Sequence, residues 1–290
     1  MKQPITTGKP NPRLGQGAVF LCAILWSTSG LCIKLIDWHP IIIAGARSGI
    51  AALCMWGVRI LFPRRGRSKN NLLLVFAAGT VYAGTMITFV AANKLTTSAN
   101  AILLQYSAPV WAAILGWIVI KERLHWKHGG ALILVMAGLF IFFKDALGGG
   151  SLAGDCIAVC SGVLFGAHSV LLRMQKDGNP ADAMLCAHIL CALFAIPFGF
   201  LYPPSLNPAG LGAILYMGTL QIGAASLLFA YGIKRVGALQ AMLTAMIEPV
   251  LNPVWVLAAT GERPSISALL GGCLIVAAVV ISSIKWGKEG

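Results

Sequence analysis

Residues 107–124 have the sequence SAPVWAAILGWIVIKERL, and residues 247–263 have the sequence IEPVLNPVWVLAATGER. In both stretches a Pro-Val pair is followed, thirteen residues after the proline, by a Glu-Arg pair. The two stretches lie 140 residues apart, and at the same offset Pro40 matches Pro180. Matching pairs at a fixed spacing indicate that the chain consists of two related halves.

The overall composition is that of a membrane protein. Of the 290 residues, 58% are hydrophobic and only 11% are charged, and the mean hydropathy is +0.81. A soluble domain carries about 25% charged residues, which cover its water-facing surface. Disordered chains combine low hydrophobicity with high charge. The composition therefore excludes both an ordinary soluble globular protein and a disordered one.

The apolar residues are grouped into segments of transmembrane length. A helix that crosses a bilayer needs about 20 apolar residues. Ten such segments can be drawn, with Gly or Pro at most junctions, and they leave no room for a sizeable soluble domain. We therefore predict an all-α integral membrane protein with ten transmembrane helices. The predicted spans are 17–36, 40–62, 72–92, 97–120, 128–143, 152–173, 181–201, 209–233, 238–260 and 265–285.

The positive charge has a distribution that orients helices in a membrane. The net charge is +13, and the basic residues occur in short segments between the apolar runs, which disfavours nucleic-acid binding. If the N-terminus is cytoplasmic, 17 of the 22 Lys and Arg residues fall in cytoplasmic segments. Because cytoplasmic loops carry an excess of Lys and Arg, we predict that both termini are cytoplasmic.

The run Gly148–Ser151 lies near the middle of the chain and is predicted to be a flexible linker. It divides the chain into residues 1–147 and residues 148–290, each with five predicted spans, which together form one transport domain. Because five is odd, the second half enters the membrane from the opposite side. Inverted repeats of this kind are typical of secondary transporters, whose substrate site lies near the membrane midplane between the repeats.

With two five-helix halves that each carry Pro-Val and Glu-Arg pairs, the chain resembles the EamA-type members of the drug/metabolite transporter superfamily. The Leu25-Trp26-Ser27-Thr28 segment of the first span is similar to that of the YddG-type amino-acid exporters in this superfamily. The resemblance implies a bacterial inner-membrane location and export of amino acids or similar small metabolites by alternating access. It also implies that predicted spans one, three, four, six, eight and nine surround the substrate cavity.

Predicted span 238–260 has the most distinct polar pattern. Polar side chains inside a membrane are costly and usually face a cavity or a partner helix. Four of them recur every four residues, which places them on one helix face: Gln240, Thr244, Glu248 and Asn252. Pro249 is expected to break the helix beside Glu248, as Pro109 does in the first half. We predict a substrate or proton site here; alternatively, Glu248 is a neutral carboxyl bonded to a neighbouring helix.

Six further side chains on other spans complete the predicted substrate-binding cavity: Trp26, Tyr82, Gln105, Tyr106, His168 and Gln221. Aromatic faces attract ammonium groups, and amides hydrogen-bond to carboxylates. Such a lining favours an uncharged or zwitterionic metabolite. The alternatives are that Trp26 and Tyr82 face the lipid or the membrane interface, and that His168 is a hydrogen-bonded packing residue.

Three charged residues near the span ends or inside a span are expected to have mainly structural roles. Arg47, within the sequence GARSG, is predicted to snorkel or to bond backbone carbonyls, with gating as the alternative. Glu122 and Glu262 are expected to pair with the arginine that follows each of them, or to cap the next helix.

Other protein classes lack support in the sequence. It contains no nucleophile elbow, Walker A run or metalloprotease motif. We therefore predict no catalytic residues, no metal and no cofactor, and as partners only a small-molecule substrate and the lipid bilayer. The alternatives are an exporter of other small metabolites or drugs coupled to protons, an integral-membrane enzyme acting on lipid head groups, and a membrane scaffold. Oligomeric state and exact substrate are left open.

The predicted topology is testable by single-cysteine labelling in a cysteine-free background. A cysteine at Ser68 is expected to react only after the inner membrane is permeabilised, because it lies in a predicted cytoplasmic loop. A cysteine at Ser151 is the matched position on the other side and is expected to react in intact cells. Labelling of position 68 from the periplasm would contradict the model with a cytoplasmic N-terminus.

Overall fold

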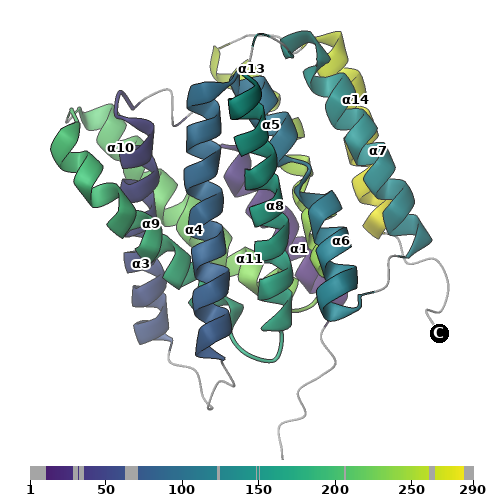
Figure 1. Ribbon diagram of the computed structural model, residues 1–290, viewed down its shortest axis with the longest axis horizontal. Coiled ribbons are helices and arrows are strands. Elements are labelled where there is room, and N and C mark those ends of the chain that lie inside the picture. Colours follow the sequence, from purple (N-terminus) through teal and green to yellow (C-terminus); the bar gives the residue numbers. More distant parts are fainter. Residues whose placement is uncertain are drawn as a thin grey trace, which may run out of the picture.

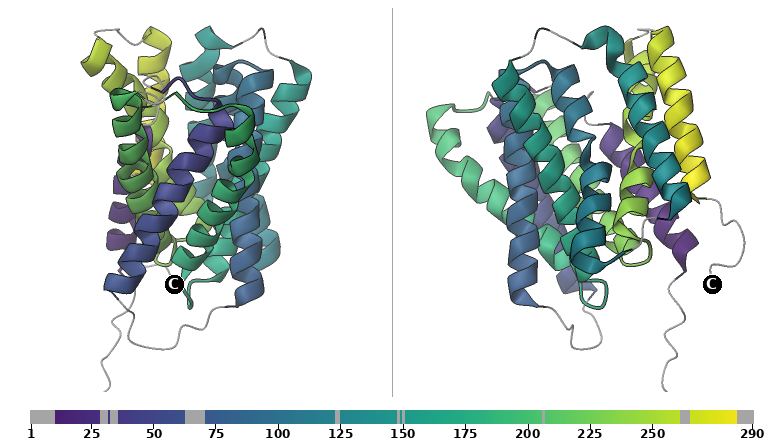
Figure 2. Two further views of the ribbon diagram at one scale, coloured as in Figure 1. Left: turned by 90° about the vertical axis from the view of Figure 1, so that its left-hand side faces the viewer. Right: turned by 45° about the vertical axis from the view of Figure 1, so that its right-hand side comes forward.

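The computed structural model describes residues 11–28, 32, 36–62, 71–122, 125–147, 149, 151–205, 207–260 and 265–283. Within these residues the protein is helical and contains no strand. The helices run along one common direction as a bundle (Figures 1 and 2). This arrangement confirms the predicted all-α class.

The first half contains α1 (Pro12–Ser27), α3 (Pro40–Leu61), α4 (Leu72–Leu95), α5 (Ser98–Gln105), α6 (Ala108–Ile120), α7 (Trp126–Phe143) and the short 3-10 helix η1 (Lys144–Ala146). The second half contains α8 (Leu152–Met174), α9 (Pro180–Leu201), α10 (Pro208–Tyr216), the π-helical segment η2 (Met217–Ala224), α11 (Ala225–Ile233), α12 (Ala238–Ala245), α13 (Ile247–Thr260) and α14 (Ile266–Ser283).

Eight helical segments in the described part of the chain are long and apolar enough to cross a membrane. They correspond to predicted spans two to eight and ten. The first predicted span is represented by α1, which ends at Ser27, and the ninth by the shorter apolar segment Ala238–Leu251 of the described residues. The count of ten spans therefore stays a prediction, although the limits of most helices agree with the sequence.

The starts of several helices follow from local sequence. Proline occupies the first turn of α1, α3, α9 and α10, where its missing amide hydrogen costs nothing. Asn11 and Asn207 precede two of these helices, and each side chain accepts a hydrogen bond from a backbone amide of the first turn. The Gly and Pro punctuation visible in the sequence therefore marks true helix boundaries.

Two helix breaks have the same cause in the two halves. A proline lacks the amide hydrogen that would bond the carbonyl four residues earlier. For Pro109 that carbonyl belongs to Gln105, the last residue of α5, and for Pro249 it belongs to Ala245, the last residue of α12. Both breaks were predicted from the sequence, and each lies one turn before its proline.

Helices of the two halves pack against one another in corresponding pairs. Helix α4 packs on α8 as α11 packs on α1, and α5 and α6 pack on α8 as α12 and α13 pack on α1. Helix α3 pairs with α9, and α7 pairs with α14 (Figure 1). The most extensive contacts therefore join the halves, so that neither half buries its apolar faces by itself.

The corresponding first helices of the two halves run in opposite directions. Helix α1 begins beside the end of α11, where Gly15 faces Gly232 and Arg235. Helix α8 begins at the opposite end, where the Ser151 hydroxyl donates to the Leu95 carbonyl at 2.6 Å. Helix α14 ends near the start of α12, since Gln240 Nε2 donates to the Ser282 carbonyl at 3.5 Å. The start of α1 and the end of α14 thus share one end of the bundle, the lower end in Figure 1.

The glycines of α8 allow this helix to lie directly against the α5–α6 break. A Cβ at Gly166 would be 2.8 Å from the carbonyl oxygen of Ala108 and 2.8 Å from the amide nitrogen of Ala112. A Cβ at Gly162 would be 3.0 Å from the carbonyl oxygen of Gln105. Small residues permit such close approach between membrane helices.

We expect Gly166→Ala to destabilise the protein by about 1–3 kcal/mol, because backbone atoms cannot move aside cheaply. Gly130→Ala in α7 is the matched control, since nothing lies within 4 Å of a Cβ there. Thermal unfolding in detergent would compare the two variants. Equal melting temperatures for Gly166→Ala and Gly130→Ala would contradict the tight contact.

Candidate functional site

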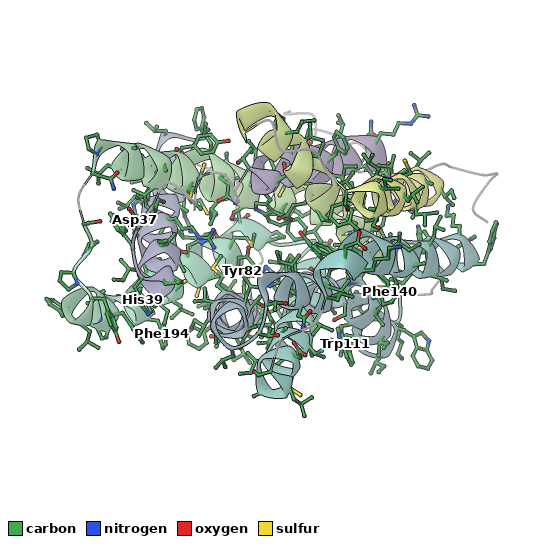
Figure 3. All side chains as sticks on the ribbon, turned by 90° about the horizontal axis from the view of Figure 1, so that it is seen from above. Asp37, His39, Tyr82, Trp111, Phe140 and Phe194 are labelled. Atoms are coloured by element: carbon green, nitrogen blue, oxygen red, sulfur yellow. The ribbon has the colours of Figure 1, made fainter. Side chains whose placement is uncertain are left out.

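Aromatic side chains from both halves meet near the middle of the bundle. The Trp26 ring of α1 lies 5.4 Å from Phe229 of α11 and 6.2 Å from Phe165 of α8. The Tyr82 ring of α4 lies 6.0 Å from Phe165. Figure 3 shows Tyr82 near the centre of the molecule when seen from above. Trp26 and Tyr82 are both buried, so they face neither lipid nor the membrane interface.

His168 packs against the side chain of Tyr82. Its ring stacks on the Tyr82 ring with centroids 4.3 Å apart. Its Nδ1 lies 2.9 Å from the Ala78 carbonyl oxygen, and its Nε2 lies 3.2 Å from the Met184 sulfur. Because both ring nitrogens contact protein groups, His168 fixes the position of Tyr82 and is not a free ligand contact.

The two proline-induced breaks bring Tyr106 and Glu248 together. Tyr106 is the residue directly after α5, and Glu248 lies in the first turn of α13. Their side chains are directed toward each other and interact electrostatically. The link joins the break of the first half to the break of the second half.

Arg47 lies within electrostatic range of Glu248, Tyr82 and Cys191. Its Nε atom is buried and has no hydrogen-bond partner. The prediction that Arg47 snorkels or bonds carbonyls is therefore wrong: the side chain is directed into the molecule. Arg47 and Glu248 are both half-buried.

Gln221 lies on the π-helical segment, a type of distortion that often marks functional sites. Its Nε2 donates to the Trp26 carbonyl at 3.4 Å, near the end of α1, while its buried Oε1 has no partner. The Nδ1 of His188 is also buried without a partner, and the Nε2 of His188 lies 2.8 Å from the Ser226 hydroxyl. His188 lies within electrostatic range of Arg47, so unsatisfied polar atoms occur together in this region.

Two of the predicted site residues use their polar groups in hydrogen bonds to other parts of the helices. Gln105 Nε2 donates to the Ser161 hydroxyl at 2.9 Å, and Ser161 donates to the Thr85 carbonyl, so Gln105 ties α5 to α8 and α4. The Thr244 hydroxyl is buried and donates to the Gln240 carbonyl of its own helix. The side chain of Asn252 lies outside the described residues.

The predicted continuous polar face from Gln240 to Asn252 is not observed. Gln240 is directed toward α14, whereas Glu248 is directed toward Tyr106 and Arg47. The helix break at Met246 is the physical reason, because it ends the regular four-residue recurrence between the two side chains. Of the predicted set, Trp26, Tyr82, Tyr106, His168, Gln221 and Glu248 form the central cluster, which Arg47 and His188 complete.

A charged link joins the halves at the lower end of the bundle. Arg173 Nε donates to Glu122 Oε1 at 2.8 Å, and Arg173 Nη1 donates to the carbonyls of Ile233 and Lys234. The other carboxylate oxygen of Glu122 accepts from the amide of Ala238, at the start of α12. The observed partner of Glu122 is therefore Arg173 of the other half, which sequence proximity could not indicate.

A hollow of about 160 Å³ adjoins this link, lined by residues that include Glu122, His128, Gly237 and Gln240. It lies at the end of the bundle and does not include the aromatic side chains of the central cluster. We therefore place the candidate site at the central cluster, where aromatic, amide and oppositely charged groups converge. The described residues contain no group of three or more side chains suited to hold a metal ion.

Comparison with known proteins agrees with this architecture. The model of the EamA-like transporter family matches twice, at residues 13–144 and 152–284. The uncharacterized transporter YwfM of Bacillus subtilis (strain 168) is 28% identical over 279 residues, which cover 93% of this chain and 94% of that protein. An uncharacterized transporter of Archaeoglobus fulgidus is 24% identical over 290 residues.

Two further likenesses concern a more distant relative and the fold. Solute carrier family 35 member G1 of Mus musculus is 27% identical over 191 residues, which cover 61% of this chain and 51% of that protein. A protein of known crystal structure superposes with a TM-score of 0.80 and 20% identity, covering 94% of this chain and 98% of the other. With both halves matched by the same family model, the chain belongs to the EamA-like transporter family.

Proposed function

We propose that this membrane transporter is a secondary transporter or facilitator that exports amino acids or similar small metabolites across the bacterial inner membrane by alternating access. The observation that carries the proposal is the central cluster, in which an aromatic, amide-bearing and charged set of side chains is enclosed between helices of both halves. Both termini are cytoplasmic in this proposal. The two halves, residues 1–147 and 148–290, act as one transport domain.

The position of the cluster supports transport rather than storage or scaffolding. Its side chains come from α1, α3 and α4 of the first half and from α8, α9 and α13 of the second. A relative motion of the two halves would therefore change access to the cluster from either side, as in transporters with inverted repeats. The Arg173–Glu122 link holds the halves together at one end and would have to open during such a cycle.

The chemistry of the cluster supports a small polar substrate with an ammonium group. Trp26 and Tyr82 offer aromatic faces, to which cations bind with about 1–2 kcal/mol when desolvated. Gln221 offers an amide oxygen that has no partner within the protein. An amino acid combines an ammonium group with a side chain that can pack on the remaining aromatic rings.

A proton-coupled exporter is the second candidate, and Glu248 is the observation in its favour. It is a half-buried carboxyl within the bundle, and it interacts with Tyr106 and Arg47. Such a carboxyl can bind a proton from one side and release it to the other as access alternates. If Glu248 stays neutral and only supports the helix break, transport runs down the substrate gradient.

Replacing the central aromatic residues should reduce transport without unfolding the protein. We expect Trp26→Ala and Tyr82→Ala to lower the affinity for substrate roughly 5- to 30-fold, the factor that corresponds to a lost contact of about 1–2 kcal/mol. Trp117→Ala is the matched control, since Trp117 of α6 is 65% exposed and faces away from the cluster. Proteoliposome flux and monodispersity in detergent provide the measurement, and unchanged flux in both central variants would show that the site lies elsewhere.

Glu248→Gln separates the two candidates, because it keeps the shape and most hydrogen bonds of the side chain but cannot titrate. For a proton-coupled exporter we expect the variant to lose accumulation driven by a pH gradient to a much greater extent than it loses substrate counterflow. Both assays use the same proteoliposomes. Full pH-driven accumulation by the variant would exclude Glu248 as the coupling group, and a wild type without response to pH gradients would identify a facilitator.

A further inference from the structure

The central cluster contains one positive and one negative side chain that do not neutralise each other directly. Arg47 on α3 and Glu248 on α13 interact electrostatically. No ion pair joins them, although the structure describes both residues and shows direct ion pairs for Arg59 with Asp182 and for Arg173 with Glu122. Two opposite charges are thus held apart inside the membrane-spanning bundle.

A charged arginine in this position has a free energy cost that the protein alone does not offset. Charged side chains inside a membrane are rare and generally paired. Buried polar groups in proteins nearly always have hydrogen-bond partners. The Nε of Arg47 has none, and Nδ1 of His188 and Oε1 of Gln221 also lack partners. The Nε donor of Arg47 is therefore available to an acceptor that does not belong to the protein.

Arg47 and Glu248 have different surroundings, and this difference would set the orientation of a molecule bound between them. Glu248 lies beside Tyr106 at the junction of the two helix breaks. Arg47 lies beside α9 and the π-helical segment, where a Cβ on Gly218 would be 3.1 Å from the Arg47 carbonyl oxygen. The Tyr82 side chain interacts electrostatically with both charged groups.

We propose that Arg47 and Glu248 bind the two ends of a zwitterion: the guanidinium of Arg47 binds the carboxylate of the substrate, and the carboxyl group of Glu248 binds its ammonium group. A guanidinium presents a planar set of donors that matches a carboxylate. The ammonium end is then next to the aromatic faces of Trp26 and Tyr82, which also attract cations. This arrangement selects for molecules that carry both charges and against amines or acids that carry only one.

This inference rests on the proposed function, since it specifies how the same site recognises an amino acid. It goes further in one respect: it assigns to Arg47 a direct contact with substrate. It also predicts that the selectivity of the transporter depends on the carboxylate of the substrate, which a site made of aromatic and amide groups alone would not require.

The first part of the test uses the wild type in proteoliposomes and measures counterflow of each of the twenty common amino acids. The amino acid with the fastest exchange is then compared with the amine formed by removal of its carboxylate and with the acid formed by removal of its amino group. We expect at least tenfold slower exchange for each analogue. Exchange of the amine at the rate of the amino acid would overturn the inference without any variant, whereas exchange of no amino acid would overturn the proposed function.

The second part compares Arg47→Gln with the wild type by the ratio of amino-acid exchange to amine exchange. We expect this ratio to fall at least tenfold, because only the amino acid loses a contact, and we expect it to fall in Arg47→Lys as well, because an ammonium lacks the planar set of donors. The ratio does not depend on how much protein is active, and the remaining amine exchange shows that the variant folds. Arg59→Gln is the matched control on the same helix, since Arg59 is 61% exposed and pairs with Asp182 at the lower end.

An unchanged ratio in Arg47→Gln would assign Arg47 a structural role and overturn the inference, while leaving amino-acid transport intact. If Arg47→Gln is not monodisperse in detergent, two other measurements test whether Arg47 binds the substrate carboxylate. They are the same ratio in Arg47→Lys and the analogue series on the wild type. Equal exchange of amino acid and amine by Arg47→Lys, with the wild type still selective, would support the proposal through loss of the planar guanidinium. The Glu248→Gln variant tests the other end of the substrate. If it prefers the amino acid over the acid without an amino group as strongly as the wild type does, the assignment of the ammonium group to Glu248 is contradicted.

Discussion

Pro109 and Pro249 each lack the amide hydrogen that would bond the carbonyl four residues earlier, and the centre of the molecule depends on the two helix breaks that follow. In a membrane, backbone groups released in this way must find partners inside the protein. The Ser107 hydroxyl donates to the Leu104 carbonyl at 2.6 Å, and Gly162 of α8 lies directly against the carbonyls of Leu104 and Gln105. The breaks are therefore stabilised by local bonds and close packing, and they place Tyr106 and Glu248 at facing helix ends.

The same breaks explain why the site belongs to both halves of the chain. Helices pair mainly across the halves, so every wall of the central cluster includes residues from each repeat. A change in the angle between the halves would alter the surroundings of Tyr82, Arg47 and Glu248 together. The Arg173–Glu122 link, which also holds the carbonyls of Ile233 and Lys234 and the amide of Ala238, joins the halves at the lower end. The hydroxyl of Ser151 and the carbonyl of Leu95 join them at the opposite end.

Much of this architecture could be predicted from the sequence because membrane helices leave strong signals. Long apolar runs gave the limits of most helices, the Pro-Val and Glu-Arg pairs indicated the repeat, and the prolines marked both breaks. Trp26, Tyr82 and Glu248 were expected at the site because aromatic and acidic side chains are conspicuous within apolar runs. Each of these predictions depends on local sequence or on a fixed spacing.

The remaining features depend on contacts between distant segments. Gln105 satisfies its amide on Ser161 of α8, and Glu122 pairs with Arg173, fifty-one positions away in the chain. The four-residue recurrence from Gln240 to Asn252 assumed a continuous helix, but the break at Met246 directs Gln240 to α14 and Glu248 to the centre. Arg47 was expected to snorkel because it lies near one end of its span; a lone arginine flanked by small residues in an apolar run was the signal that pointed to the interior.

The central claim is that the enclosed cluster between the halves holds an amino acid by its two charged ends. A structure determined with the fastest-exchanged amino acid bound tests this claim most directly. We predict ligand density within hydrogen-bond distance of both the Arg47 guanidinium and the Glu248 carboxyl, beside the rings of Trp26 and Tyr82. Density in the hollow next to Glu122 and His128 instead, or a carboxylate directed away from Arg47, would contradict it.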